Sequence, residues 1–179
     1  ASAALPFEPI ARFLDNVKKN PSFRAVQDLY GWIEHNAMPL TEDGCFLAYK
    51  IISENWKDLY TRQLDNSIGA TVEVNRNQVD EDPDRTCSFG LHGCGYEYLP
   101  NYGGFYGVGG GNRVVMIKVN PADVVAFPKD YGNAKFRCCK YVVIEEVPHE
   151  RAKDFYHGDE SAYAPAEPTR WLVVHGNQQ

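Results

Sequence analysis

The sequence predicts an α+β fold, with an N-terminal helical hairpin packed on a mixed, mainly antiparallel β-sheet. Apolar residues recur with helical spacing up to about residue 36, and short apolar runs alternate with turn residues from residue 41 to residue 147. No helical pattern separates these runs, which favours an antiparallel arrangement over alternating β-α-β units. A chain of 179 residues is long enough to enclose a hydrophobic core as one domain.

The hairpin is predicted over residues 10–36. Its first helix carries an apolar stripe over two turns, made of Ile10, Phe13, Leu14 and Val17. Asn20 and Pro21 end this helix, and Pro21 also begins the second one. The second stripe consists of Val26, Leu29, Tyr30 and Ile33. These stripes favour packing against the sheet, although a helical hairpin is also a suitable surface for a partner.

The predicted strands follow the hairpin and occupy residues 45–52, 71–74, 114–119, 124–127 and 135–147. The acidic residues 78–85 include a proline and are predicted to form an exposed loop. We therefore expect a single domain at residues 6–147, with the hairpin in residues 6–40 and the sheet in residues 41–147. Residues 148–179 form a polar tail, whose apolar segment at residues 171–174 either adds an edge strand or docks loosely.

Composition and charge exclude several classes of protein. A net charge of −6 and a pI near 5.3 argue against a nucleic-acid duplex as partner, because phosphate backbones favour basic faces. No apolar run approaches the eighteen or so residues that span a bilayer. Five cysteines, with Cys138 and Cys139 adjacent, disfavour a disulfide framework and favour reduced thiols in a cytosol. Cys87, His92 and Cys94 lack the spacing of a zinc knuckle, so no metal and no cofactor are expected.

Polar residues inside two apolar segments predict a binding site. Tyr49 and Lys50 stand within the run of residues 46–52, where an ammonium needs an anionic partner or water. His92 follows Gly90 and Leu91 among small residues that let other groups approach closely. We expect His92 and Lys50 to be catalytic groups that handle an anionic, phosphate-like ligand. The alternatives are a His92 satisfied near the core and a Lys50 that reaches solvent from an edge strand.

Further residues are expected to complete one concave site around this pair. The predicted ligand-binding residues are Tyr49, Ser88, Tyr96, Arg85, Arg113 and Tyr106. Arg85 and Arg113 would reach an anion bidentately from the rim. Tyr106 belongs to a glycine-rich segment at residues 103–112, which is either a flap that closes over a ligand or the tip of a hairpin.

Several motifs together resemble one family. The stretches that carry the resemblance are residues 39–50, 65–69, 86–92, 98–100, 118–125 and 135–141, following the helical hairpin. They look like the rIIB-like bacteriophage proteins, and the resemblance extends over about residues 6–147. It implies a phage protein in the infected host cytoplasm that controls lysis or counters host exclusion and defence. It implies no particular biochemical activity.

A weaker similarity concerns the order of the strands. The order of strands and polar residues is similar to the ADP-ribosyltransferase arrangement. Tyr49 and Lys50 would stand at the first position of the site and His92 at the second. Where that arrangement has a Glu before a late Tyr, this chain has Lys140 before Tyr141. The departure disfavours transferase chemistry and leaves a cleft shaped for a nucleotide.

Two functional hypotheses follow. In the first, the protein binds or cleaves a small nucleotide-like anionic ligand, which would suit a phage protein that disarms host defence. In the second, it is a non-enzymatic interaction module acting on a host or phage partner through its helical hairpin or acidic loop. The sequence does not distinguish an enzyme from a binding protein, and it defines neither the oligomeric state nor whether the chain is part of a longer protein.

Overall fold

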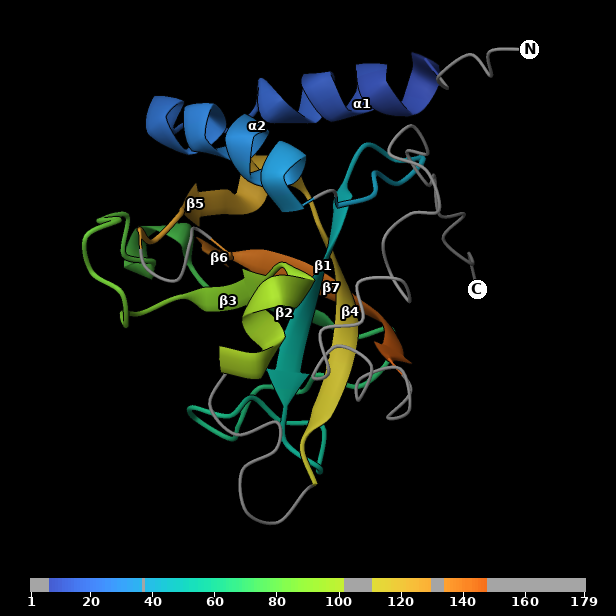
Figure 1. Cartoon of the computed structure of the whole chain (residues 1–179), viewed down its shortest axis with the longest axis vertical. Coiled ribbons are helices and arrows are strands. Elements are labelled where there is room, and N and C mark those ends of the chain that lie inside the picture. Colours follow the sequence, from blue (N-terminus) through green and yellow to red (C-terminus); the bar gives the residue numbers. More distant parts are fainter. Residues whose placement is uncertain (1–6, 37, 102–110, 130–133, 148–179) are drawn as a thin grey trace.

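The computed structural model describes residues 7–36, 38–101, 111–129 and 134–147. Within them, two helices precede a seven-stranded sheet, which confirms the predicted α+β class. Figure 1 shows both helices at one end of the sheet, above strands that twist away from them. Neither helix is long and apolar enough to cross a membrane, within the part of the chain that the structure describes. The predicted tail at residues 148–179 and most of the glycine-rich segment lie outside the described residues.

The helical pair matches the predicted hairpin. Helix α1 spans Phe7–Val17 and helix α2 spans Phe23–Asn36. Asn20, in the turn between them, accepts a hydrogen bond from the Ser22 amide and donates to the carbonyls of Pro121 and Val124. The Asn20 side chain therefore ties the junction of the two helices to Pro121 and Val124, while the Ser22 hydroxyl caps α2 by accepting a hydrogen bond from the Ala25 amide.

The sheet has the strand order β2-β7-β4-β1-β3-β6-β5, and all described strand pairs are antiparallel. The strands are β1 (Phe46–Ile52), β2 (Thr71–Glu73), β3 (Leu91–Cys94), β4 (Arg113–Val119), β5 (Val124–Ala126), β6 (Lys135–Cys138) and β7 (Lys140–Val147). The prediction of one strand over residues 135–147 is wrong. The strand is interrupted at Cys139. As a result, β6 pairs with β3, whereas β7 pairs with β4.

The core lies where α2 covers the sheet. Trp32 packs its ring against three phenylalanines, at centroid distances of 5.6 Å to Phe46, 5.9 Å to Phe127 and 5.0 Å to Phe136. All four aromatic residues are buried, and their tilted and edge contacts are the arrangements that aromatic rings prefer. This cluster fixes α2 over β1, β5 and β6, and so positions the outer face of α2.

Candidate functional site

Lys50 is buried in the middle of β1, with a relative exposure of 6%. Its ammonium donates a hydrogen bond of 2.7 Å to the His92 carbonyl and lies 5.5 Å from the centre of the Tyr141 ring. Burial lowers the pKa of Lys50. A backbone carbonyl on the neighbouring strand therefore satisfies the cation that was predicted to need an anionic partner.

The strand register places the side chains of Lys50 and His92 on opposite faces of the sheet. Tyr49 pairs with Cys94 across the β1–β3 junction, and successive strand residues alternate between faces. A Cβ on Gly93 would lie 2.4 Å from the Phe136 ring, on the face that also buries Lys50. His92 must therefore point to the other face. The structure does not bring the two predicted catalytic side chains together, because only the His92 backbone meets Lys50.

On the face that carries His92, two buried cations hold a loop. Arg137, opposite His92 in the register, is fully buried and donates to the carbonyls of Asp82 and Arg85. Lys135 donates to the Thr86 carbonyl at 2.7 Å. Side chains from β6 therefore hold the predicted exposed loop against the sheet. Their hydrogen bonds are among the stronger ones in proteins because the donors are charged. We refer to residues 80–88 as the clamped loop.

His92 is neutral in this setting. Burial, with further contributions from the charges of Lys50, Arg137 and Lys135, lowers the pKa of His92 to about 3. An imidazole with such a pKa is a weak base near neutral pH, where efficient general bases titrate. The structure therefore gives His92 the electrostatics of a packed neutral residue.

Because the pKa of His92 is lower in the folded state, acid should destabilise the protein through this residue. Between pH 6.5 and pH 3 the unfolded chain binds the proton more readily, so stability falls as the pH falls. We expect His92→Gln to remove about 3 kcal/mol of the loss in unfolding free energy between pH 7 and pH 4. Urea titrations of both proteins at those two pH values measure this difference. Identical pH dependence would contradict a half-buried His92 that is held neutral.

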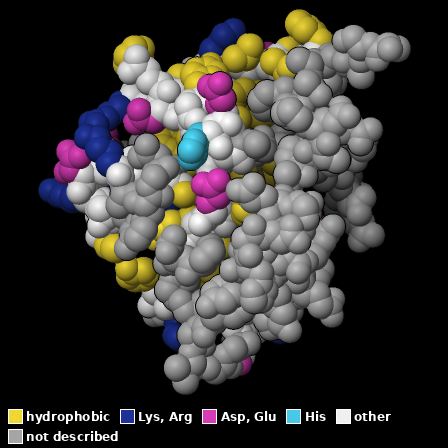
Figure 2. Space-filling view, viewed as in Figure 1, with side chains coloured by type: hydrophobic (Ala, Val, Ile, Leu, Met, Phe, Trp, Pro, Cys, Tyr) yellow, Lys and Arg dark blue, Asp and Glu magenta, His cyan; other side chains and the backbone are white. Residues whose placement is uncertain are grey.

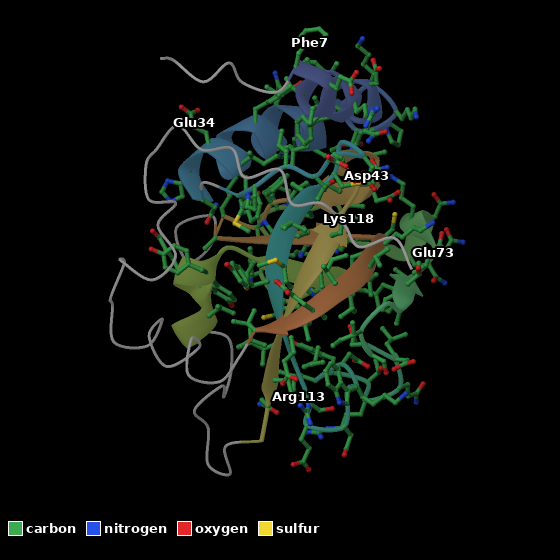
Figure 3. All side chains as sticks on the ribbon, turned by 90° about the vertical axis from the view of Figure 1, so that its right-hand side faces the viewer. Phe7, Glu34, Asp43, Glu73, Arg113 and Lys118 are labelled. Carbon is green, nitrogen blue, oxygen red and sulfur yellow. The ribbon has the colours of Figure 1, made fainter. Side chains whose placement is uncertain are left out.

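The remaining predicted ligand residues are distributed over separate parts of the structure. Arg85 pairs with Asp80 at 3.2 Å, and the Ser88 hydroxyl donates to the same carboxylate, within the clamped loop. Arg113 pairs with Glu146 at 2.9 Å and stacks on Trp56. Figure 3 shows Arg113 at the end of the molecule opposite Phe7.

Two further predicted ligand residues are the tyrosines Tyr96 and Tyr106. Tyr96 packs against the main core in a 3₁₀ helix, and Tyr106 lies outside the described residues. The functional roles that the sequence suggested for these residues stay predictions.

A groove runs along one flank of α2, on the side of the clamped loop. We call it the α2 groove, and its volume is about 590 Å³. Its lining residues are Arg24, Gln27, Asp28, Gly31, Trp32, His35, Pro83, Phe127 and Lys129. The Lys129 amide donates to the Pro83 carbonyl at 3.1 Å, which joins the clamped loop to the segment after β5 as one wall. The buried cations beneath the loop therefore also hold this wall in place.

Two features of the α2 groove have no structural explanation within the described residues. Trp32 is 3% exposed, yet its indole N–H has no hydrogen-bond partner among them. Gly31 lies inside the helix, and a Cβ there would have no atom within 4 Å. Buried donors normally find acceptors, and glycine weakens a helix interior. Only Gly31 faces open space, because the indole nitrogen of Trp32 is itself enclosed by the protein.

We expect Gly31→Ala to stabilise the protein. The added methyl group meets open space, and alanine is about 1 kcal/mol more favourable than glycine inside a helix. Thermal unfolding should show a midpoint about 2–4 °C higher than that of the unmodified chain. A lower midpoint would mean that the helix needs glycine here for its own packing.

The sequence hypothesis missed the α2 groove because its walls come from distant segments. The signals available were a glycine inside the helical pattern and a charged loop with Pro83, which is buried in the structure. Neither the glycine nor the loop shows in the sequence that the two are neighbours in the fold.

Among the described residues, no group of three or more His, Cys, Asp or Glu side chains is placed to hold a metal ion. All five cysteines are free thiols.

Fold and surface together define an α+β domain with buried, internally paired cations and an open groove on one helix. The family model described as Bacteriophage T4 protein rIIB matches residues 8–154, and the chain belongs to this family. The chain is 40% identical over 144 residues to Protein rIIB of Enterobacteria phage T4, an alignment that covers 80% of this chain and 45% of that protein. The chain thus spans about half the length of this relative. No solved structure matches this chain.

Proposed function

We propose that this phage domain is an interaction module that binds a partner protein in the infected host cytoplasm through the α2 groove. The observation that carries the proposal is the contrast between two surfaces. The cations of the predicted anion site are bonded to the protein's own carbonyls and carboxylates. The α2 groove instead is an open hollow of about 590 Å³, in which a Cβ on Gly31 would have no atom within 4 Å. We further propose that it acts there in countering host defence or in controlling lysis.

A small nucleotide-like anion in the same groove is the second candidate. A volume of about 590 Å³ is typical of small-molecule sites, and Arg24 and Lys129 lie in the lining. These cations already face carboxylates, however, since Arg24 lies 4.0 Å from Asp28 and Lys129 lies 2.8 Å from Asp84. The groove therefore offers an incoming phosphate little uncompensated positive charge, which favours the partner protein.

Photo-crosslinking in infected cells tests the proposal. A benzophenone amino acid replaces exposed Gln27 at the lining of the α2 groove or, as a matched control, exposed Asp15 on α1. We expect a discrete crosslinked product from position 27 and none of the same mass from position 15. The purified product's partner should bind the unmodified chain and lose at least tenfold in affinity for Gly31→Trp, which fills the groove. The same product from both positions, or none from position 27, would contradict the proposal.

A thermal-shift screen against mononucleotides, NAD and cyclic dinucleotides separates the second candidate. A ligand at a hundred times its dissociation constant should add about 2.7 kcal/mol to the unfolding free energy. We expect no such stabilisation. A shift that disappears in Gly31→Trp would favour the small ligand over a partner protein.

A further inference from the structure

We propose that the chain forms a symmetric dimer, in which the outer surface of the helix pair packs against the same surface of a second copy. This surface is not the α2 groove, so the inference goes beyond the proposed function and does not depend on it. Three properties of the surface support it: its exposed apolar side chains, the area that they offer, and its charge.

The helix pair carries most of the exposed apolar side chains. Within the described residues, seven large hydrophobic side chains are exposed, and four of them belong to α1 and α2. These four are Phe7, Leu14, Phe23 and Tyr30, with exposed fractions of 80%, 41%, 77% and 45%. Figure 2 shows hydrophobic side chains along the upper edge of the molecule, where Figure 1 places the two helices. We call these four residues the helix-pair patch.

The spacing of the patch residues separates them from the α2 groove. Along α1, Phe7 and Leu14 lie two helical turns apart, with Ile10 between them on the same stripe. Phe23 and Tyr30 repeat this spacing along α2. Neither of them lines the groove, whose residues on α2 form another stripe. The patch is therefore a second surface of the helix pair.

The exposed area of the patch matches the requirement of a dimer. An aromatic residue has about 150–250 Å² of surface to bury, so at their exposed fractions the four patch residues offer about 350–600 Å². Two copies bring about 700–1,200 Å² together. A standard interface buries about 1,200–2,000 Å², of which about 56–65% is apolar. A second copy of the patch thus supplies the apolar part of a stable interface.

The charge of the helix pair also suits a second copy. Residues 7–36 contain four acidic and four basic side chains, all of them exposed, so with histidine neutral this segment has no net charge. The whole chain carries −6, and the rest of the sequence therefore accounts for all of it. Like charges that meet across an interface are unfavourable. Two copies of this acidic chain therefore repel each other least where their helix pairs meet.

Most charges on the helices are compensated within each copy. Three ion pairs join side chains of one helix, Arg12 with Glu8 at 3.6 Å, Lys18 with Asp15 at 3.5 Å and Arg24 with Asp28 at 4.0 Å. The two charges that remain on residues 7–36, Lys19 and Glu34, have opposite signs. The patch thus requires no charged partner, and a neutral apolar surface such as its own copy fits it.

The arrangement of the helices suits a twofold axis. The chain enters α1 at Phe7 from one side of the pair and enters α2 at Phe23 from the other side (Figure 1). Figure 3 shows Phe7 at the top of the molecule, pointing away from the sheet. A twofold axis through the middle of the patch brings Phe7 of one copy beside Phe23 of the second copy, and the same contact then occurs twice.

Sedimentation velocity of the purified chain tests the proposal. We expect a species of twice the 20.2 kDa chain mass, whose fraction increases with concentration in the micromolar range. The double variant Phe7→Ser, Phe23→Ser should weaken dimerisation at least tenfold, with an unchanged thermal midpoint because both rings are exposed. As a second variant, Tyr30→Glu places a charge in the patch and should weaken dimerisation at least tenfold as well.

A matched double variant separates the patch from exposed aromatic residues in general. Tyr60→Ser, Phe89→Ser removes rings that are 83% and 56% exposed outside the helix pair, and it should change the dissociation constant less than twofold. A chain that stays monomeric throughout the micromolar range, or a dimer that both double variants weaken equally, would overturn the inference. A dimer that Gly31→Trp weakens while the patch variants do not would also overturn it, because the contact would then lie in the α2 groove.

Discussion

Arg137→Met should lower the unfolding free energy by about 2–5 kcal/mol. The guanidinium is fully buried and donates to two carbonyls of the clamped loop, and hydrogen bonds from charged groups contribute about 1.5–3 kcal/mol each. Methionine keeps much of the apolar stem, so the change removes the buried charge together with its hydrogen bonds to the loop. Chemical denaturation measures the loss, and hydrogen exchange should show faster exchange of the amides in residues 80–88 than in β1 or β4.

The matched control is Arg85→Met in the same loop. The Arg85 side chain is 68% exposed and forms surface ion pairs with Asp80 and Asp82, which contribute little to stability. We expect a change within about 1 kcal/mol and unaltered exchange in the loop. If both substitutions have the same small effect, Arg137 does not hold the loop, and the wall of the α2 groove needs another explanation.

Lys50→Glu should be the most damaging change in β1, with a loss of at least about 3 kcal/mol. A carboxylate at this position would face the His92 carbonyl, which now accepts a hydrogen bond from the Lys50 ammonium at 2.7 Å. Two acceptors would meet in a buried site with no donor between them, and isolated buried charge is strongly unfavourable. The expected result is loss of soluble folded protein, or a thermal midpoint lower by at least about 6 °C.

Lys50→Met controls for the size of the side chain. It removes the charge and its desolvation together with the hydrogen bond, and replacing buried charges by apolar groups of similar volume is often close to neutral. We expect a change within about 2 kcal/mol and a folded protein. A collapse as severe as that of Lys50→Glu would mean that the ammonium itself is indispensable, as a ligand-binding or catalytic lysine also could be.

Much of the fold follows from the sequence, since its patterns are local. The helical stripes of α1 and α2 could be identified from their periodicity, and β1 from a short continuous apolar run that follows a turn. The division at Cys139 could not, because β6 and β7 form one apolar run whose two halves pair with different strands. An apolar run shows that a strand exists. Which strand it pairs with depends on the tertiary packing of the whole sheet.

The candidate site was harder to predict for a related reason. Adjacent residues such as Tyr49 and Lys50 belong to opposite faces of a strand, so grouping them by chemistry ignored the period of two. Lys50 found its partner in a backbone carbonyl, which every residue offers and no sequence motif identifies. The α2 groove depends on a loop that lies beside Gly31 and Trp32 only after folding. The sequence held the residues of the groove but not their proximity.

The central claim is that the α2 groove carries the function while Lys50 has a structural role. The most direct test compares lysis timing in cultures infected by phage that encode Gly31→Trp, Gly31→Ala or Lys50→Met in the full-length protein. The account predicts altered timing for Gly31→Trp and unchanged timing for the other two, with all three proteins folded and equally abundant. Unchanged timing for Gly31→Trp together with altered timing for folded Lys50→Met would contradict this expectation. That result would favour a functional site around Lys50 on β1 instead of the α2 groove.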